Sequence, residues 1–369
     1  MKYYLIAGEA SGDLHASNLM RGLQACDPAC EIRFWGGDAM AAVGGTQVRS
    51  YRDTAMMGYT DVLRKARKVL GGLAFCKKDI LDWHPDAVVL VDYPGFNLKV
   101  AHFAHRQGFK VFWYIAPKVW AHFAGRVKKL RRDVDVLYSI FPFELEWFRE
   151  RGIEPRYFGN PLLDRIAQVP LQPMDGPRIA LLPGSRKMEL KFLMPRLVEL
   201  ERLLSADTRF ASYRLTLAGA PSLDKADYQQ YLPPDSKIEV VFGRTYEILA
   251  ASEAAVISSG TASLEAALLG TPQVVCYGSD PFSWFIARLT VRVPHVSLAN
   301  LTLGRRIFPE LLQEFATPAA IFRELERILL DGQTAARMRT DYEELRKVLG
   351  SEGASGRIAQ DMYHEITRV

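Results

Sequence analysis

Short apolar runs bounded by turn residues alternate with amphipathic stretches along the chain. This alternation is typical of repeated βα units, whose parallel strands are buried on both faces and are therefore apolar throughout. A first series of strands is expected at residues 3–7, 32–35, 87–91, 111–115 and 136–140. A second series is expected at residues 178–182, 214–218, 239–242, 254–257 and 274–277. The sequence therefore predicts an α/β protein with two doubly wound, Rossmann-like domains.

A stretch rich in helix-breaking residues separates the two series. Residues 160–164 are followed by Pro170, Pro173, Gly176 and Pro177, so we expect a linker near residues 165–176. The expected domains are residues 1–165 and 166–345. The remaining residues, 346–369, are predicted to be helical, and the last helix could return to pack on the N-terminal domain. Two such domains facing a central cleft would present the carboxyl ends of both sheets to a nucleotide and a second substrate.

Length and composition agree with this architecture. A chain of 369 residues is long enough for about two domains, and 49% hydrophobic with 24% charged residues excludes a disordered or low-complexity protein. The longest apolar runs, such as residues 111–116, are far shorter than the roughly 20 residues of a transmembrane helix. The net charge of +5 is too small to indicate nucleic-acid binding by itself.

The N-terminus and the cysteines bear on the cellular compartment. The chain reaches Gly8 and Glu9 before a signal-peptide core could form, so we expect a cytoplasmic protein without a targeting segment. The four cysteines include no Cys-x-x-Cys pair and are too few for a disulfide framework. We therefore expect free thiols.

Two loops of the first domain carry candidate chemistry. The first strand leads into Gly8-Glu9-Ala10-Ser11-Gly12-Asp13, and the strand at residues 87–91 leads into Asp92-Tyr93-Pro94-Gly95-Phe96-Asn97. The first loop lacks the Gly-x-Gly-x-x-Gly spacing, and no acidic residue ends the second strand, which disfavours a nicotinamide cofactor. A carboxylate at a strand's carboxyl end can act as general base for an acceptor hydroxyl, with Asp92 the first candidate and Glu9 the second. A plain turn and a helix cap are the structural alternatives.

Two loops of the second domain are predicted to bind a diphosphate. Residues 183–187 precede a helix start, and Arg186 offers a forked cation suited to phosphate. Residues 258–265 run from a strand into a helix whose first amides attract anions, and Glu265 could accept hydrogen bonds from ribose. A surface arginine and an empty helix cap are the alternatives. The nucleotide-binding candidates are Gly184, Ser185, Arg186, Ser259, Gly260, Thr261, Ala262 and Glu265.

No pattern in the chain makes a convincing metal site. Asp133 and Asp135 have the Asp-x-Asp spacing of metal-dependent glycosyltransferases, but Asp135 opens an apolar strand and two arginines precede the pair. His102 and His105 have no third ligand nearby in sequence. We therefore expect neither a metal nor another cofactor.

The stretch from residue 62 to residue 73 combines an apolar helical face with four basic residues. This pattern indicates either an interfacial helix attracted to an anionic membrane surface or a core-facing helix with a solvated basic face. The candidate membrane-contact residues are Val62, Leu63, Val69, Leu70 and Leu73. A second basic run, residues 126–132, follows the aromatic-rich residues 113–123 and has the same two interpretations.

Six segments together resemble one enzyme family. They are Gly8-Glu9-Ala10-Ser11-Gly12-Asp13, Asp92-Tyr93-Pro94-Gly95-Phe96-Asn97, Pro117-Lys118-Val119-Trp120-Ala121, Pro183-Gly184-Ser185-Arg186, Ser259-Gly260-Thr261-Ala262 and Val296-Ser297-Leu298-Ala299-Asn300-Leu301. Each is weak alone, but their order along nearly the whole chain is similar to that in the bacterial lipid-A-disaccharide synthases.

The resemblance implies a fold and a reaction. The fold would be GT-B, with an N-terminal acceptor- or lipid-binding domain and a C-terminal domain that binds a UDP-sugar. The reaction would join UDP-2,3-diacylglucosamine to 2,3-diacylglucosamine 1-phosphate, releasing UDP and forming a β-1,6-linked disaccharide with inversion and without a metal. Because both substrates are acylated, the resemblance also implies a peripheral protein on the inner face of the inner membrane.

The resemblance also implies roles for individual residues. The family motifs carry over Glu9, Arg186 and Asn300 as required residues, and the catalytic candidates are Asp92, Glu9 and Arg186. Some relatives have a second aspartate where this chain has Gly95, so here Asp92 would have to be the base. Residues 120–122 depart from the Trp-Ala-Trp of relatives, which leaves their role open. The remaining candidates for substrate binding are Gly8, Ser11, Gly12, Asp13, Asn97 and Asn300.

Other functions remain alternatives at this stage. A UDP-N-acetylglucosamine 2-epimerase or a lipid-linked peptidoglycan glycosyltransferase would share the architecture but not the motif set. A nucleotide-sugar-binding protein without turnover would keep residues 259–261 and lack a working base. The two basic runs would also suit nucleic acid, although no recognition motif accompanies them. The sequence leaves open whether the helical tail completes its own domain or exchanges with a second copy in a homodimer.

Overall fold

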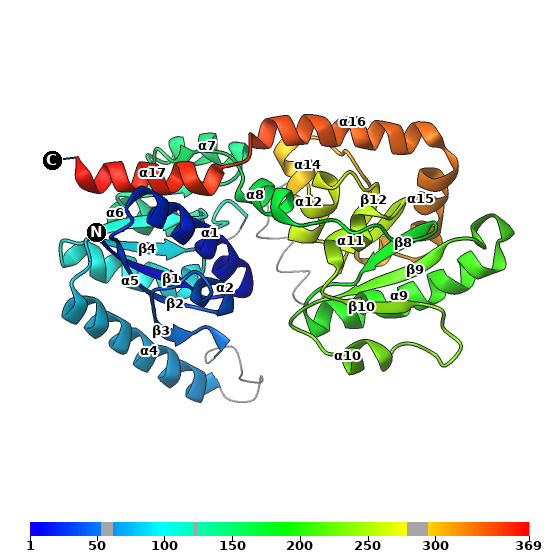
Figure 1. The fold of residues 1–369 in the computed structure, drawn as a ribbon. Helices are drawn as coiled ribbons and strands as arrows, with labels where there is room; N and C mark the ends of the chain where they lie inside the picture. Colours follow the sequence, from blue (N-terminus) through cyan, green and yellow to red (C-terminus); the bar gives the residue numbers. More distant parts are fainter. Residues whose placement is uncertain (53–61, 122–123, 279–293, 369) are drawn as a thin grey trace. The chain divides into compact units, whose positions relative to one another are not determined.

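The computed structural model describes residues 1–52, 62–121, 124–278 and 294–368, with the backbone alone for residues 62–69. It divides into two compact units. Unit 1 comprises Met1–Asp164 and Leu349–Val369, and unit 2 comprises Arg165–Val348. The sequence pattern placed these divisions at residues 165 and 346 (Figure 1).

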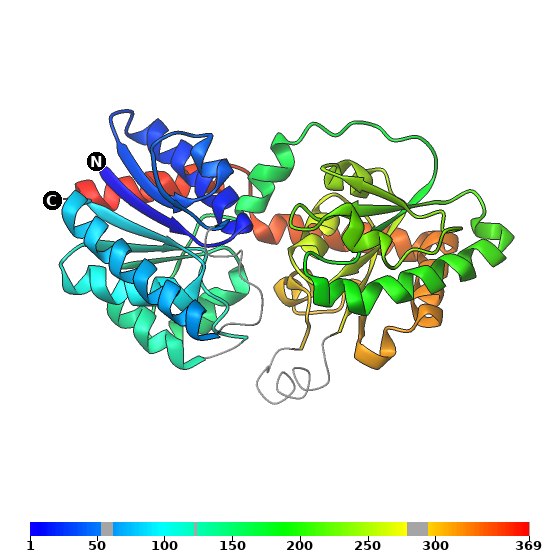
Figure 2. The same ribbon diagram turned by 90° about the horizontal axis from the view of Figure 1, so that it is seen from below.

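Unit 1 is built on a parallel sheet in the order β3-β2-β1-β4-β5-β6-β7. Its strands are β1 (Lys2–Ala7), β2 (Glu31–Gly36), β3 (Thr46–Ser50), β4 (Ala87–Val91), β5 (Lys110–Tyr114), β6 (Val136–Ser139) and β7 (Arg156–Tyr157). Its helices are α1 (Ala10–Cys26), α2 (Asp38–Ala41), α4 (Val62–Trp83), α5 (Pro94–Arg106), α6 (Val127–Asp133), α7 (Pro142–Arg149), α8 (Pro161–Gln168) and α17 (Ala354–Thr367), with α8 continuing into unit 2. Helices cover both faces of the sheet (Figure 2).

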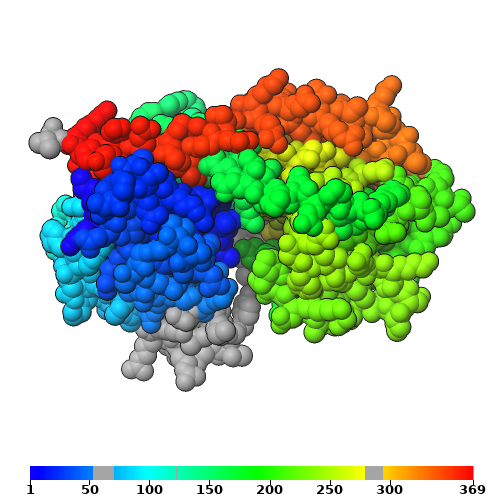
Figure 3. Space-filling model, viewed as in Figure 1, coloured from blue at the N-terminus to red at the C-terminus, as the bar shows by residue number. Residues whose placement is uncertain are grey.

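Burial on both faces explains the continuous apolar strands of unit 1. Every residue of β4 is fully buried, and β1 is buried from Tyr3 to its end. The last helix, α17, lies along α1 (Figures 1 and 3), where Gly22 allows close approach to Ala359. Asp164 accepts hydrogen bonds from the amides at the start of α17, including Ser355 at 2.9 Å, and so fixes the returning segment.

Unit 2 repeats the design with a sheet in the order β10-β9-β8-β11-β12-β13. Its strands are β8 (Arg178–Leu182), β9 (Arg214–Gly219), β10 (Glu239–Phe242), β11 (Ala254–Ser258), β12 (Gln273–Tyr277) and β13 (Glu310–Leu312). Its helices are α9 (Lys187–Ala206), α10 (Lys225–Gln229), α11 (Thr245–Ala250), α12 (Thr261–Leu268), α14 (Leu298–Leu303), α15 (Pro318–Leu330) and α16 (Gly332–Leu349).

Four features differ from the sequence expectation. The edge strands β3, β7 and β13 were not predicted, because they have two to five residues and two of them carry mainly polar residues. Residues 165–168, expected in a linker, are the last turn of α8.

Among the described residues, none of the helices combines the length and hydrophobicity needed to cross a membrane.

Helix α4 bears on the predicted membrane contact. Leu73 is only 8% exposed and packs in the core of unit 1, so its side chain is not available to a membrane, which corrects the expectation for this residue. Leu70 is 58% exposed. The side chains of Val62, Leu63 and Val69 lie outside the part of the chain that the structure describes.

Candidate functional site

Each sheet reverses its strand order at one point. In unit 1 the order runs away from the β1–β4 pair in both directions, and in unit 2 it runs away from the β8–β11 pair. The loops after the two strands of such a pair lead in opposite directions. The crevice between these loops is where open α/β proteins bind their ligands. In unit 1, residues 8–13 follow β1 and residues 92–97 follow β4. In unit 2, residues 183–187 follow β8, and residues 258–265 begin at the last residue of β11. All four loops singled out from sequence therefore lie at the two switch points.

The loop after β1 has one exposed and one buried carboxylate. Glu9 is exposed at the start of α1, and among the described residues no hydrogen-bond donor occupies its carboxylate. Asp13 is 4% exposed, and its carboxylate accepts the amides of Gly37, Ala39 and Met40 at 2.6, 3.1 and 3.3 Å. Asp13 thus caps α2 and has no free oxygen for a ligand. Its assignment to substrate binding stays a prediction, and the structure gives Asp13 a capping role.

The other members of this loop are the small residues Gly8, Ser11 and Gly12. Gly8 lies directly against the ring of Tyr93, and a Cβ there would overlap the ring. Gly12 is buried between Ala7 and Val91, while Ser11 is exposed. Ser11 is therefore the member whose side chain is open to a ligand.

The backbone after β4 is unusual. Asp92 and the following Tyr93 both have left-handed conformations, with φ of 44° and 49°, and Ile115 after the neighbouring strand β5 has φ of 64°. Such conformations cost about 1–3 kcal/mol each for residues with a side chain, and they gather at functional sites. Together with the switch point, this strain marks Asp92 as the centre of the candidate site in unit 1.

Four influences set the acidity of Asp92. Burial raises the pKa of the Asp92 carboxyl, and the nearby carboxylate of Glu9 raises it further. The ammonium of Lys118 and a hydrogen bond from the Tyr93 backbone lower it, and the net pKa lies above the usual aspartate value. A carboxyl tuned in this way is suited to accept a proton from a hydroxyl at neutral pH.

Asn97 holds this loop in place through hydrogen bonds to backbone carbonyls. Its side chain is fully buried, and its Nδ2 donates to the carbonyl of Asp92 at 2.8 Å, with Val91 and Ile6 carbonyls at 3.3 and 3.4 Å. The amide therefore ties the ends of β1 and β4 together. Asn97 thus positions Asp92, and its assignment to substrate binding stays a prediction.

The loop after β8 in unit 2 is closed by an internal carboxylate. Glu189 Oε2 accepts the amides of Ser185 and Arg186 at 2.7 and 3.3 Å, and Glu189 Oε1 pairs with the Arg186 guanidinium at 3.0 Å. The Cβ that Gly184 lacks would overlap this carboxylate. The Ser185 and Arg186 amides predicted for a diphosphate are thus already occupied, while the Arg186 side chain remains 73% exposed.

The loop after β11 is open. Gly260 begins α12 with φ of 153° and has no neighbour near its missing Cβ, and Thr261 is exposed. The first amides of a helix have no partner within the helix, so those of Thr261 and Ala262 are available to an anion. Glu265 accepts a hydrogen bond from Tyr246 at 2.7 Å, which fixes its carboxylate beside this loop.

Three residues in the segments that follow β5 and β6 were assigned no role from the sequence. Lys118 is exposed after β5, and its charge acts on both Asp92 and Glu144. Glu144 is 1% exposed, and burial raises its pKa to about 7. Trp120 donates its indole N–H to Glu144 at 2.8 Å. The position of Lys118 directly after the strand next to β4 was the signal that could have found it.

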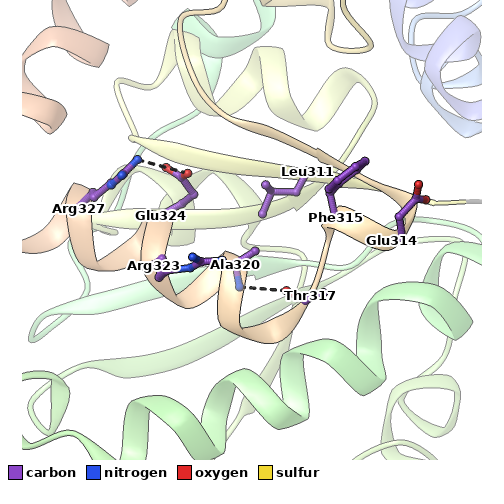
Figure 4. A pocket seen from close by; sticks show the side chains of 8 residues that line it. All are labelled: Leu311, Glu314, Phe315, Thr317, Ala320, Arg323, Glu324 and Arg327. Atoms are coloured by element: carbon purple, nitrogen blue, oxygen red, sulfur yellow. Dashed lines mark hydrogen bonds and ion pairs between the residues drawn. The ribbon is translucent and has the colours of Figure 1, made fainter.

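Other candidate sites have structural roles. The Asp133 carboxylate contacts Arg132 and His102, and Asp135 accepts the amide of Val111 at 2.7 Å. Over the described ranges, no three His, Cys, Asp or Glu side chains gather as metal ligands would. A cavity of about 380 Å³ on β13 and α15 contains none of the predicted site residues (Figure 4). It is lined by Leu311, Glu314, Phe315, Thr317, Ala320, Arg323, Glu324 and Arg327.

Comparison with known proteins decides the family. The sequence model of a family described as lipid-A-disaccharide synthetase matches residues 3–361. The chain belongs to this family. The lipid-A-disaccharide synthase of Myxococcus xanthus is 36% identical over 368 residues, covering 97% of this chain and 96% of the relative. That of Geobacter metallireducens is 36% identical over 366 residues, covering 96% and 94%. The resemblance inferred from the six motifs is confirmed.

Solved structures confirm the fold of this lipid-A-disaccharide synthase family member. The UDP-GlcNAc 2-epimerase from Neisseria meningitidis gives a TM-score of 0.68 at 11% identity, covering 98% of this chain and 100% of the other. The calicheamicin glycosyltransferase CalG4 gives 0.61 at 18% identity, covering 99% and 98%. These likenesses show the two parallel-sheet α/β domains of the GT-B fold, and the family makes this protein a glycosyltransferase of lipid A biosynthesis.

In this member of the lipid-A-disaccharide synthase family, Asn300 has a structural environment. It is fully buried, its Oδ1 accepts the Ile307 amide at 2.9 Å, and its Nδ2 donates to Glu310 at 2.9 Å. Glu310 also accepts the amide and hydroxyl of Ser297 at 2.8 and 2.5 Å. Asn300 therefore acts with Glu310 to hold the start of α14, and its assignment to substrate binding stays a prediction. Glu310 was missed because it lies ten residues away in sequence.

This network predicts coupled losses of stability. Asn300→Ala and Glu310→Ala should each lower the free energy of unfolding by about 1–3 kcal/mol, because each leaves buried partners unpaired. The double variant should lose less than the sum by at least ~0.5 kcal/mol, since the two residues share one network. Chemical denaturation of the four proteins measures this. Additive losses would contradict the shared network, and an Asn300→Ala variant with native stability and a raised KM would support substrate binding.

Proposed function

We propose that this protein transfers the 2,3-diacylglucosaminyl group of UDP-2,3-diacylglucosamine to the 6-hydroxyl of 2,3-diacylglucosamine 1-phosphate, releasing UDP and forming a β-1,6 linkage. One observation carries the proposal: the four motif loops lie at the switch points of the two sheets, with a proton-accepting carboxylate in unit 1 and open helix amides in unit 2. Family membership supports the choice of substrates.

The acceptor side of the reaction needs a base. We assign this role to Asp92, which would take the proton of the 6-hydroxyl as that oxygen attacks the anomeric carbon. The Glu9 carboxylate raises the pKa of Asp92, and the Lys118 ammonium lowers it. A single displacement on an α-linked donor gives the β-linked product, so the proposed reaction inverts the anomeric centre.

The donor side needs stabilisation of the departing diphosphate. The amides of Thr261 and Ala262 supply an anion site without an internal carboxylate, and Arg186 supplies a cation that is 73% exposed and paired with Glu189. Glu265 would accept hydrogen bonds from the ribose. In this proposal amides and guanidinium stabilise UDP, so the reaction proceeds without a metal.

Product formation tests the assignment directly. We expect disaccharide from the two substrates in detergent with EDTA, and a loss in kcat of about 100-fold or more in Asp92→Asn and in Arg186→Ala. Two control variants should retain activity. Asp86→Asn changes a carboxylate at the opposite end of β4, and Arg202→Ala removes an exposed arginine on α9 that pairs with Glu199, three residues before it. Wild-type binding of UDP without turnover would favour a nucleotide-sugar-binding protein, and full activity of Asp92→Asn would move the base to Glu9.

The pH profile tests which group titrates. The base must be deprotonated, so kcat/KM should fall as the pH drops through the raised pKa of Asp92. Lys118→Met removes a cation that lowers this pKa, so the acid limb should move to higher pH. Glu9→Gln removes a carboxylate that raises it, so the limb should move to lower pH. Shifts of the same sign in both variants would show that another group controls the limb.

We also propose that α4 brings unit 1 to the anionic inner face of the inner membrane, where acylated substrates reside. The helix exposes Leu70 at 58%, Phe75 at 47% and Leu81 at 45%, and the sequence places four basic residues between positions 64 and 68. Apolar insertion and charge attraction together are the requirements for interfacial binding.

Vesicle sedimentation tests this contact. Leu70→Ser should weaken binding to vesicles of anionic phospholipid by about tenfold or more, the loss expected when one leucine no longer leaves water. Leu330→Ser is the matched control, because Leu330 is 48% exposed on α15 of unit 2. Equal binding of wild type and Leu70→Ser would contradict the proposal for this residue.

A further inference from the structure

A buried carboxylate fixes an aromatic side chain near Asp92. Trp120 belongs to the loop after β5, and Glu144 to the first turn of α7 after β6. Because β4, β5 and β6 are adjacent and parallel, these segments lie at the same edge of the sheet as Asp92. Trp120 and Glu144 are therefore on the side of unit 1 where the proposed acceptor would bind.

Both oxygens of Glu144 are used inside the protein. Oε1 accepts the indole N–H of Trp120 at 2.8 Å, and Oε2 accepts the hydroxyl of Ser139. Glu144 and Ser139 are each 1% exposed. A buried carboxylate with two neutral donors is costly to disturb, because removing one donor leaves the acceptor unpaired. This network holds Trp120 in one orientation.

Trp120 itself is half-buried, and its polar atom points inward. Its ring meets Phe143 edge-on at a centroid distance of 5.0 Å, and Phe143 stacks on the buried Phe141 at 5.5 Å. Since the indole N–H is bound to Glu144, the exposed part of the ring is apolar carbon. The result is a rigid aromatic surface with a charged neighbour, Lys118, two residues away in the chain.

We propose that Trp120 is a fixed platform that contacts the apolar surface of the acylated sugar acceptor, and that Glu144 and Ser139 are positioning residues for it. The ligand class follows from the surface: an aromatic face binds the C–H side of a pyranose or an acyl chain, and Lys118 beside it suits the acceptor's phosphate. This inference rests on the proposed function for the identity of the acceptor. The hydrogen bond to Glu144 supplies the preorganisation that such a contact requires.

Steady-state kinetics separate the platform from a structural role. Trp120→Ala should raise the KM for 2,3-diacylglucosamine 1-phosphate by about tenfold, with the KM for the UDP-sugar unchanged. Glu144→Ala should do the same, whereas Glu144→Gln, which keeps an acceptor for the indole N–H, should restore the wild-type KM. Trp147→Ala on α7 is the matched control for loss of a tryptophan, and thermal unfolding establishes that each variant is folded. An unchanged acceptor KM in Trp120→Ala overturns the platform, and equal defects in Glu144→Gln and Glu144→Ala overturn the positioning role.

A binding measurement keeps this test independent of turnover. The fluorescence difference between wild type and Trp120→Phe should be quenched when 2,3-diacylglucosamine 1-phosphate is added, and glucosamine 1-phosphate distinguishes contact with the sugar ring from contact with the acyl chains. Quenching without wild-type turnover would reject the proposed reaction and retain the platform. Turnover without any change in the Trp120 signal would retain the reaction and reject the platform.

Discussion

The contact between the ring of Tyr93 and the backbone of Gly8 joins the two central strands of unit 1 at the point where their loops diverge. It requires a glycine on β1's side and a left-handed backbone at Asp92 and Tyr93 on β4's side. Asn97 then binds carbonyls from both strands and holds that strained backbone in place. The orientation of Asp92, its burial and its proximity to Glu9 all depend on this junction.

Internal carboxylates decide which helix starts remain open to ligands. Asp13 caps α2, Asp164 caps α17, Glu189 closes the start of α9 and Glu310 closes the start of α14. Each satisfies amides that would otherwise attract an anion. Helix α12 begins with Gly260, which has no side chain to play this part. Among the described residues no internal carboxylate occupies the first amides of α12, and in the proposed function these amides bind the diphosphate of the donor.

Local pattern was sufficient for the inner strands and for the edge strand β10, and insufficient for the edge strands β3, β7 and β13. Strands such as β4 and β8 are apolar throughout because both faces are buried, so their sequences identify them. The edge strand β3 reads Thr-Gln-Val-Arg-Ser and forms because β2 offers it hydrogen bonds, which is a property of the neighbour. The sequence also did not predict α8 as a helix, because its residues lie among prolines that indicate a linker.

The sequence by itself determined the architecture and the four loops of the candidate site, since alternating apolar runs fix parallel strands and motifs fall where those strands end. Which residues of the loops are free was decided only by the tertiary structure. Asp13, Asn97 and Asn300 have the residue types of ligand-binding groups, but Asp13 accepts backbone amides, the Asn97 Nδ2 donates to backbone carbonyls, and Asn300 pairs with Glu310 and the Ile307 amide. Leu73 fits an interfacial helix in sequence and lies in the core. Hydrogen-bond partners and burial depend on chain segments that meet only on folding, and no local pattern records them.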